Sequence, residues 1–322
     1  SEPHPLQEKA MNFTEFSDAV QSNIGKVIIG KRNAVELMLV ALLCDGHVLL
    51  EDVPGIGKTT LAKALARSID CSFARIQFTP DLLPSDVTGI NYYNQKKQEF
   101  EFRPGPVFSQ ILLGDEINRA PPRTQAGLLE AMQERQVTVD IDTMALPRPF
   151  MVLATQNPVE LEGTFPLPEA QLDRFLIQVQ LGYPTLEEED EILIQYQRQD
   201  PMDALKPVVD SRAILALQAE VRSIHISDDL RRYILEVVRS TRDHDGVDLG
   251  VSPRGSLALF RAAQALAALR GRDYVIPSDV QHLAPPLLTH RIHISPQTRL
   301  RGRTPEQVVA EIAERVPVPV AE

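Results

Sequence analysis

The sequence predicts an α/β protein, with a three-layer αβα core around a parallel sheet over residues 13–183 and a smaller all-α domain over residues 184–322. Two observations predict this division. Within the first region, short and nearly continuous apolar runs alternate with amphipathic stretches, which is typical of parallel strands covered by helices on both faces. Beyond Tyr183 and Pro184 only helical patterns remain. Residues 1–12 are expected to form a flexible tail.

Four apolar runs indicate the strands of the sheet. They are HVLLEDV (47–53), SFARIQF (72–78), ILLGDE (111–116) and FMVLATQN (150–157). After the boundary, Thr185 followed by Glu187 and Glu188 is typical of a capped helix start, because acidic side chains favour the positive end of the helix dipole. Further helices are expected over residues 211–223, 228–241, 254–270, 278–288 and 304–316.

Composition excludes some functions and sets the expected compartment. The chain has 33 Lys and Arg against 44 Asp and Glu, a net charge of -11. This argues against sequence-blind nucleic-acid binding, which depends on clustered cations. Cys44 and Cys71 are isolated, which indicates a reducing compartment and no disulfide framework. Without a signal pattern or an apolar run of ~20 residues, a cytoplasmic protein without a transmembrane segment is expected.

The segment HVLLEDVPGIGKTTLAKALARSI predicts a strand, a glycine-containing loop and a helix. Lys58 and Thr59 stand where the helix begins, and free backbone N–H groups there favour a phosphate. Lys58 is expected to reach the β- and γ-phosphates, and the Thr59 hydroxyl to ligate magnesium. The pattern GxxxxGK[ST] has Asp52 in place of its first glycine. The other expected phosphate-binding residues are Pro54, Gly55, Ile56, Gly57 and Thr60.

Two further strand ends carry polar side chains suited to the same chemistry. ILLGDE ends in Asp115 and Glu116. Asp115 is expected to hold Mg²⁺, mostly through water, and Glu116 to polarise the attacking water as a general base. FMVLATQN ends in Asn157, whose amide would contact the γ-phosphate or the lytic water. A cap on the following Asn-Pro turn is an equally good interpretation of Asn157.

The order of phosphate loop, DE-ending strand and Asn-ending strand resembles the AAA+ ATPases. Three segments resemble the MoxR family within that group: DEINRAPPRTQAGLLEAMQERQVT, ATQNPVELEGTFPLPEAQLDRF and SPRGSLALFRAAQALAALRGRDYVIPSDV. The resemblance covers residues 13 to 295. It implies a P-loop core with a helical lid, hydrolysis of ATP to ADP with Mg²⁺, and a homo-oligomeric ring, usually a hexamer. It also implies chaperone-like remodelling of client complexes, often with a von Willebrand factor A domain partner. No nucleic-acid partner is expected, because the net charge is acidic and no basic extension is present.

The resemblance assigns roles to further residues. Arg174, in LDRF, matches the arginine finger that reaches a neighbouring subunit's γ-phosphate; a salt bridge with Asp173 is the alternative. Arg254, in VSPRGS, matches the sensor 2 arginine of the lid, and whether it contacts its own or a neighbour's nucleotide is open. The adenine-lining segment is matched by Val27, Ile28, Ile29 and Gly30, with core packing as the alternative.

Several interpretations stay open. Arg119 and Arg123 would lie at a subunit interface or cap the following helix. Residues 91–102 and 134–150 have the pattern of hairpin inserts, which face the pore or a partner in related rings. A magnesium-chelatase-like motor, and less so a nucleic-acid motor, are the alternative functions. Asp243, His244, Asp245 and Asp248 lack the full spacing and the terminal Glu of a calcium loop, so a solvated acidic loop is expected there. Structural or surface roles are expected for His290 and His293.

Overall fold

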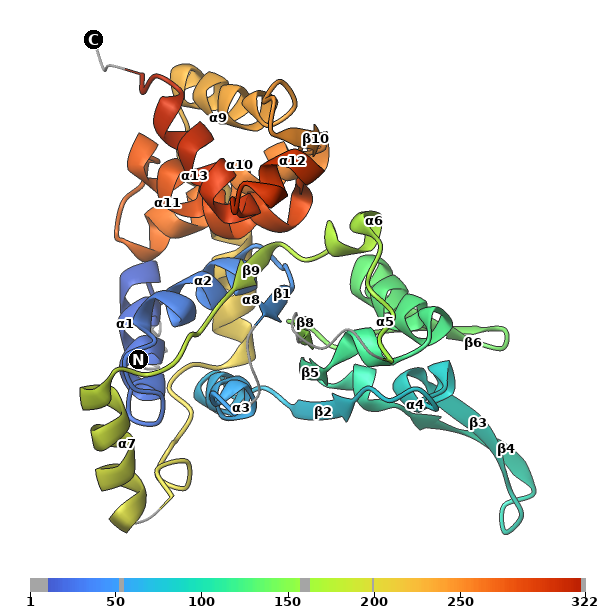
Figure 1. Cartoon of the computed structure of the whole chain (residues 1–322). Coiled ribbons are helices and arrows are strands. Elements are labelled where there is room, and N and C mark those ends of the chain that lie inside the picture. Colours follow the sequence, from blue (N-terminus) through green and yellow to red (C-terminus); the bar gives the residue numbers. More distant parts are fainter. Residues whose placement is uncertain (1–10, 52–54, 157–162, 199, 320–322) are drawn as a thin grey trace, which may run out of the picture.

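The computed structural model describes residues 11–51, 55–156, 163–198 and 200–319. Its centre is a five-stranded parallel sheet with the strand order β2-β5-β8-β1-β9 (Figure 1). The strands are β1 (Val48–Glu51), β2 (Phe73–Gln77), β5 (Ile111–Asp115), β8 (Met151–Gln156) and β9 (Ile177–Val179). The four predicted strands are confirmed, and β9 adds a short edge strand that the apolar pattern does not reveal.

The sheet separates two apolar layers, because successive side chains of a strand point to opposite faces. Val48 and Leu50 of β1 join one buried cluster, whereas Leu49 between them joins the other. The first cluster includes helices α1 (Phe13–Ile24), α2 (Arg32–Leu43) and α3 (Lys58–Ser68). The second includes α5 (Pro122–Glu134). The predicted three-layer αβα core is therefore confirmed.

The carboxyl-terminal half is helical, as predicted, and its last helices form a bundle at one end of the core (Figure 1). Its helices are α7 (Leu186–Arg198), α8 (Ser211–Glu220), α9 (Asp228–Ser240), α10 (Pro253–Leu269), α11 (Pro277–Leu288), α12 (Pro296–Leu300) and α13 (Pro305–Arg315). Within the bundle, β10 (Val247–Leu249) pairs antiparallel with β11 (His293–Ile294), which the helical patterns do not predict. Figure 1 places α7 apart from this bundle, beside α1.

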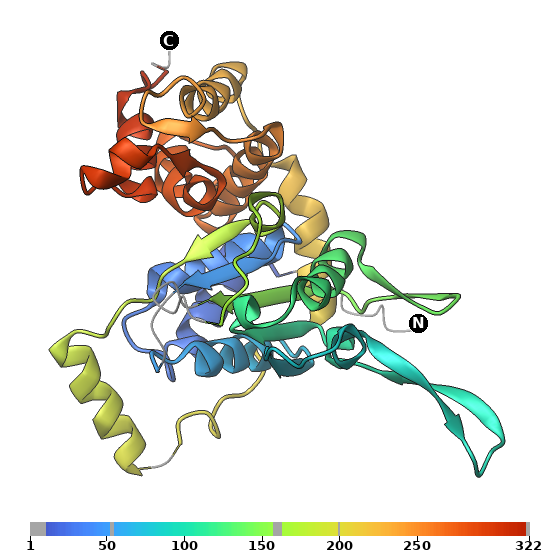
Figure 2. The same ribbon diagram turned by 45° about the vertical axis from the view of Figure 1, so that its right-hand side comes forward.

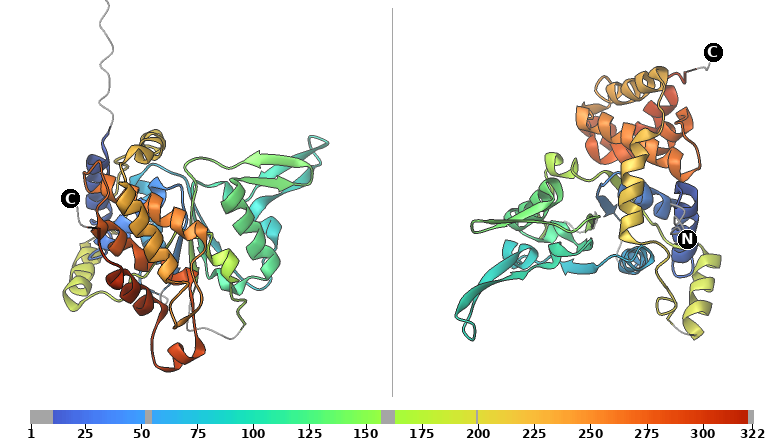
Figure 3. Two further views of the ribbon diagram at one scale, coloured as in Figure 1. Left: turned by 90° about the horizontal axis from the view of Figure 1, so that it is seen from above. Right: turned by 180° about the vertical axis from the view of Figure 1, so that it is seen from behind.

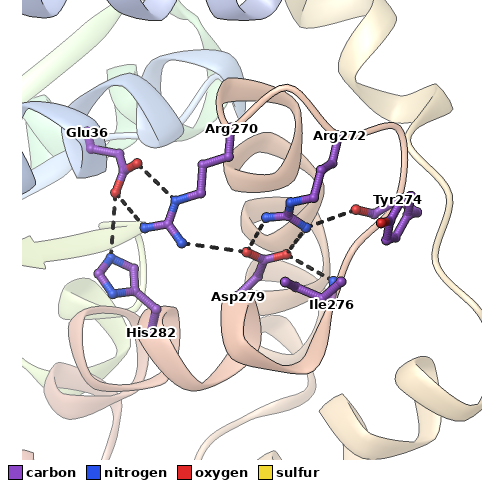
Figure 4. A network of polar contacts seen from close by, with 7 residues as sticks. All are labelled: Glu36, Arg270, Arg272, Tyr274, Ile276, Asp279 and His282. Atoms are coloured by element: carbon purple, nitrogen blue, oxygen red, sulfur yellow. Dashed lines mark hydrogen bonds and ion pairs between the residues drawn. The ribbon is translucent and has the colours of Figure 1, made fainter. Parts of the chain in front are cut away.

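A polar network joins α2 of the core to α10, α11 and the turn between them in the helical bundle, here called the lid (Figure 4). Glu36 accepts two hydrogen bonds from Arg270, at 3.1 and 2.9 Å, and its carboxylate lies 3.7 Å from His282 Nε2. Asp279 is fully buried and receives two hydrogen bonds from the Arg272 guanidinium, at 2.7 and 2.6 Å. Separation of Arg272 from Asp279 would leave a buried carboxylate without its counter-ion, which is energetically costly. This pair should therefore keep the turn after α10 fixed against α11.

Two antiparallel hairpins extend together from the side of the core that carries α5 (Figures 2 and 3). They consist of β3 (Gly89–Asn94) with β4 (Glu99–Pro104), and of β6 (Gln136–Val139) with β7 (Asp142–Ala145). The structure thus has hairpins where the sequence pattern indicates them. Asn91 donates a 2.8 Å hydrogen bond to Asp140, which links the two. Their apolar side chains include Phe100, 74% exposed, and Ile141, 93% exposed.

Six short helical elements complete the described part of the chain. They are α4 (Pro84–Thr88), α6 (Glu169–Leu172), and the 3₁₀ turns η1 (Pro106–Phe108), η2 (Ile117–Arg119), η3 (Val221–Ser223) and η4 (Thr289–Arg291). Among the described residues, no helix is both long enough and apolar enough to cross a membrane.

Candidate functional site

The strands end in polar residues at one edge of the sheet, and β5 and β8 bring three of these groups into contact. Asp115 Oδ1 accepts a 2.6 Å hydrogen bond from the hydroxyl of Thr155, which in turn accepts one of 2.8 Å from the Glu116 backbone N–H. Asp115 Oδ2 pairs with Arg75 Nη2 at 2.6 Å. Thr155 is fully buried, so it fixes both acidic residues relative to the sheet.

Glu116 leaves the strand in a left-handed conformation, with φ at 56°. Such a backbone costs a non-glycine residue about 1–3 kcal/mol and persists only where its surroundings hold it. Here the carboxylate Oε2 accepts from Gln77 Nε2 at 3.0 Å and lies 2.9 Å from Arg119 Nε. Two side chains from separate elements therefore fix the direction of the Glu116 carboxylate.

The phosphate loop follows β1, whose neighbour in the sheet is β8. Gly55 and Gly57 have φ of 86° and 89°, which L residues rarely adopt, so both positions require glycine. Gly57 is the N-cap of α3 and has no side chain to cap it, and Lys58 is the first helical residue. The helix start with Lys58 and Thr59 thus has the form of an anion site. Pro54 and Asp52 lie outside the described residues.

The donor set at this edge fits a hard cation. Mg²⁺ prefers oxygen ligands and binds through one or two carboxylates, together with hydroxyl groups and phosphates. Asp115 offers a carboxylate held by Thr155, and Thr59 offers a hydroxyl in the first turn of α3. The chain can therefore supply both protein ligands expected for magnesium beside a nucleotide.

A cavity of about 360 Å³ lies between α1, α2 and α7. Ile28, Ile29 and Gly30 line it, as expected for an adenine site, together with Glu191 of α7. Val27 is instead buried in the core, 4% exposed. The α1–α2 connection thus brings three of the four expected residues to one cavity.

We expect Gly30→Ala to weaken ATP binding several-fold. Gly30 has φ of 72°, and a Cβ there would lie 1.8 Å from Glu188 Oε1. Glu188 would have to leave the Thr185 N–H that it caps and the Lys31 ammonium 3.8 Å away. This would loosen α7 over the cavity. The measurement is the KM for ATP.

Gly302→Ala is the matched control for this change. Gly302 has a similar φ of 77°, but a Cβ there would meet no atom within 4 Å. Both variants should lose about 1–2 kcal/mol of stability from the left-handed backbone. Only Gly30→Ala should raise KM, and an equal KM in both variants would contradict a role for the Gly30 contact.

The segment that carries Arg174 lies between α6 and β9. The alternative salt bridge with Asp173 does not form, because Asp173 Oδ1 pairs with Arg291 Nε at 2.7 Å. Among the described residues, no hydrogen bond or ion pair holds the Arg174 side chain. Asp173 Oδ2 also accepts from the Ser252 hydroxyl at 3.3 Å, and Ser252 is the N-cap of α10. Arg254, exposed in the first turn of α10, therefore lies on an element that contacts the Arg174 segment.

The remaining candidates differ in placement. Arg119 pairs with Glu116, and Arg123 is exposed in the first turn of α5, whose N-cap Pro121 makes no side-chain capping bond. Asn157 lies outside the described residues.

The histidines considered in the sequence have ordinary structural surroundings. His290 is half-buried, and its Nε2 lies 2.9 Å from the Phe175 carbonyl oxygen. Burial, together with the Arg291 charge, holds the pKa of His290 well below its usual value, so the ring is neutral. His293 is half exposed and its Nδ1 lies 3.1 Å from a carboxylate oxygen of Glu169. In the acidic loop, His244 Nδ1 accepts from the Gly246 backbone N–H at 3.0 Å.

Thr155 and Gln77 are site residues that sequence reasoning missed. Gln77 is the last residue of β2, and Thr155 is the last but one of β8. Both strands are neighbours of β5, which ends at Asp115. The structure groups them through the register, because β2 pairs Gln77 with Asp115 and β8 ends beside β5. The sequence offered only the polar character of both residues near a strand end, without showing which strands are neighbours.

We expect Thr155→Val to lower ATP turnover by about 10–100-fold, because misplacement of catalytic groups by about 1 Å has effects of this size. The substitution keeps the shape of the side chain but removes the contacts to Asp115 and Glu116. It should also cost about 1–3 kcal/mol of stability through the unpaired N–H of Glu116. Thr138→Val, on the exposed hairpin strand β6, is the control and should leave turnover unchanged. Steady-state phosphate release measures both, and equal rates would contradict the positioning role.

Comparison with known proteins agrees with this geometry. Residues 47–177 match the "ATPase family associated with various cellular activities (AAA)", and residues 239–312 match the "AAA lid domain". A crystal structure described as "a putative ATPase" from Cytophaga hutchinsonii superposes with a TM-score of 0.89 at 39% identity, over 96% of each chain. An MCM homologue from Methanopyrus kandleri shares the fold, with a TM-score of 0.60 at 20% identity, over 91% of this chain and 64% of its own.

Curated relatives extend the similarity over nearly the whole chain. "Uncharacterized protein YeaC" of Bacillus subtilis is 53% identical over 98% of this chain and 96% of its own. "Chaperone MoxR1" of Mycobacterium tuberculosis is 43% identical over 92% of this chain and 80% of its own. "Protein MoxR" of Paracoccus denitrificans is 34% identical over 95% of this chain and 97% of its own. With a parallel αβα core, a helical lid and this similarity along its length, the chain belongs to the MoxR family of AAA+ ATPases.

Proposed function

We propose that the protein hydrolyses ATP to ADP and phosphate with Mg²⁺, at sites between the subunits of a homo-oligomeric ring, a hexamer. The single observation that carries the proposal is the Thr155 contact, which holds Asp115 and Glu116 at the edge of the sheet next to the phosphate loop. Membership of an ATPase family supports the reaction. In this proposal residues 13–183 form the catalytic core and residues 184–322 the lid and carboxyl-terminal segment.

The phosphates would be held by the helix start of α3. Backbone N–H groups after Gly57 and the Lys58 ammonium offset the charge of the β- and γ-phosphates. Thr59 and Asp115 would ligate magnesium, which, when bound, supplies further charge stabilisation between the phosphates. Ile28, Ile29 and Gly30 would contact the adenine, and the adjoining loop residues would follow the phosphate chain.

Glu116 would act on the attacking water. Its carboxylate has a fixed direction, set by Gln77 and Arg119, and a positioned base of this kind contributes about 10²–10⁴-fold to the rate. Asn157 would hold the same water or the γ-phosphate from the end of β8. Proton transfer to Glu116 would accompany attack of the water oxygen on the γ-phosphorus. The bond from that phosphorus to the β,γ-bridging oxygen would break, and ADP would leave with the bonding electron pair.

The site would be completed by a second subunit. Arg174 would reach the neighbour's γ-phosphate, which agrees with a guanidinium that no described residue of its own chain holds. An arginine supplied in this way stabilises the charge of the transition state. Arg254 would couple the position of the lid to the nucleotide.

Hydrolysis would serve to remodel or mature client protein complexes. The relative named "Chaperone MoxR1" and the exposed apolar side chains of the two hairpins support this role. A partner with a von Willebrand factor A domain is part of the same proposal. A magnesium-chelatase-like motor is the second candidate, because "Magnesium-chelatase subunit ChlI-1" of Arabidopsis thaliana is 31% identical. That similarity spans only 58% of this chain and 44% of its own, so the MoxR-like role is favoured.

Phosphate release by the purified protein tests the proposal. Activity should need Mg²⁺, disappear with excess EDTA, and rise per subunit with protein concentration, because each site needs a neighbour. Size-exclusion chromatography with light scattering should show assembly over the same concentrations. A turnover per subunit that is constant from dilute monomer to assembled protein would contradict the shared site.

The client is tested by affinity capture from a lysate of the source cells, using Glu116→Gln with ATP to hold the engaged state. Lys58→Ala is the control, since it should not hold ATP. A partner retained only by Glu116→Gln with ATP, and released when ATP is removed, would support remodelling. Identical recovery with both variants would contradict it.

A further inference from the structure

Arg291 is a buried lid arginine whose hydrogen bonds converge on the segment around Arg174. Its side chain is 3% exposed. Nε donates to Asp173 Oδ1 at 2.7 Å, and Nη2 donates to the backbone oxygens of Asp173 at 3.3 Å and Phe175 at 2.7 Å. Nη1 donates to the Leu176 backbone oxygen at 3.1 Å. One guanidinium therefore holds the chain on both sides of Arg174.

The other side of Arg291 is anchored in the lid. Nη1 also donates to the Leu287 carbonyl of α11 and contacts His290 Nε2 at 2.9 Å. A Cβ at Gly255 of α10 would lie 3.3 Å from Arg291 Cδ, so the first turn of α10 packs directly on this side chain. The same turn carries Arg254.

These contacts make a rigid connection. Release of the Asp173 carboxylate would leave the buried Arg291 charge without its counter-ion, so the segment and the lid should move together. Arg174 is the member of the segment that Arg291 does not bind. Its backbone is fixed by its neighbours, while its partly exposed side chain makes no hydrogen bond or ion pair to the described residues.

We infer that Arg291 is a positioning residue for Arg174, so that the lid of each subunit sets the placement of the arginine it presents to the next subunit's nucleotide. The inference rests on the proposed function, in which Arg174 acts on a neighbouring site. It goes further by naming the route through which the lid of one subunit controls hydrolysis in another. Through Arg254 and Ser252, the same lid helix would relate that control to the nucleotide that Arg254 contacts.

The test uses mixed assemblies in which presentation and hydrolysis belong to different subunits. A donor with Glu116→Gln keeps Arg174 but cannot hydrolyse ATP. An acceptor with Arg174→Ala keeps its own site but presents no arginine. Neither should be active alone, and mixing should restore phosphate release. Co-purification through a tag on the donor verifies that the two assemble.

Arg291→Lys is then added to one partner at a time. In the donor it should lower the restored rate by about 10²-fold, the effect expected when a catalytic group is displaced by about 1 Å. In the acceptor it should leave the restored rate within twofold, because the acceptor presents no arginine. A merely structural role of Arg291 would not produce this difference between partners.

Arg272→Lys in the donor is the matched control. Arg272 is another largely buried lid arginine with a two-bond carboxylate contact, to Asp279, but it does not contact the Arg174 segment. It should leave the restored rate unchanged. Thermal unfolding shows whether Arg291→Lys folds. If it does not, Asp173→Asn in the donor takes its place, because it removes the carboxylate with which Arg291 pairs. This variant should also lower the restored rate.

The outcomes separate the two claims. Equal losses from Arg291→Lys in donor and acceptor, or no loss in the donor, would overturn the positioning role while leaving the shared site intact. If the parent donor and acceptor co-purify yet restore no activity, or do not assemble, the proposed action of Arg174 on a neighbour fails, and the inference fails with it.

Discussion

Glu116→Gln is expected to reduce ATP turnover by at least about 10²-fold, up to about 10⁴-fold, with ATP still bound. The amide keeps the size of the carboxylate and can still accept from Gln77 Nε2, so the local structure should persist. It cannot take the proton from the attacking water. Phosphate release at saturating ATP gives the rate, and equilibrium binding of a fluorescent ATP analogue gives the affinity.

Glu130→Gln is the control for this substitution. Glu130 is an exposed carboxylate on α5, the helix that follows Glu116 in the chain, and the change should not affect turnover. A Glu116→Gln protein that turns over at the parent rate would exclude Glu116 as the base. It would instead favour a nucleotide-dependent scaffold that does not depend on hydrolysis.

Arg174→Ala is expected to lower turnover by about 10³–10⁵-fold, about 4–7 kcal/mol in the barrier, with nearly unchanged affinity for ATP. The guanidinium would act on charge that develops only in the transition state, so ground-state binding should not depend on it. Stability should also hold, since no described residue pairs with this side chain. Single-turnover kinetics of the assembled protein separates the chemical step from binding.

Arg231→Ala serves as the comparison for Arg174→Ala. Arg231 is an exposed arginine of α9 that pairs with Asp228 at 3.0 Å, and its loss should leave turnover unchanged. A large rise in KM for Arg174→Ala with unchanged kcat would contradict the role proposed for Arg174, because that pattern reports loss of ground-state binding.

The sequence predicted those parts of the fold that depend on local pattern. The strands β1, β2, β5 and β8 are apolar runs that end in polar residues, and the lid helices have clear starts and stops. The edge strand β9 was missed because three residues are too few for a periodic signal. β10 and β11 were missed for the same reason, since they contribute three and two residues to their pair.

The site was predictable where chemistry and spacing coincide in one segment, as at Lys58 and Asp115. Thr155 and Gln77 were not, because their roles depend on which strands are neighbours in the sheet. Arg291 lies 118 positions from Asp173 along the chain, and no local pattern announces that contact. Only the packing of the lid on the core brings the two together.

The longer hairpin can act as a lever arm. β3 and β4 have six residues each, so at about 3.3 Å per residue the arm is about 20 Å long, and a rotation of about 10° at its base would move its tip by about 3.5 Å. Gly89 and Gly105 pack the base tightly, because a Cβ on either would lie 2.4 Å from a backbone oxygen. The base joins α4, and the Thr124 hydroxyl of α5 donates to the Leu82 carbonyl just before α4. β5 with Asp115 follows in the chain. Small displacements at the carboxylates would thus become displacements of several ångströms at the exposed aromatic tip.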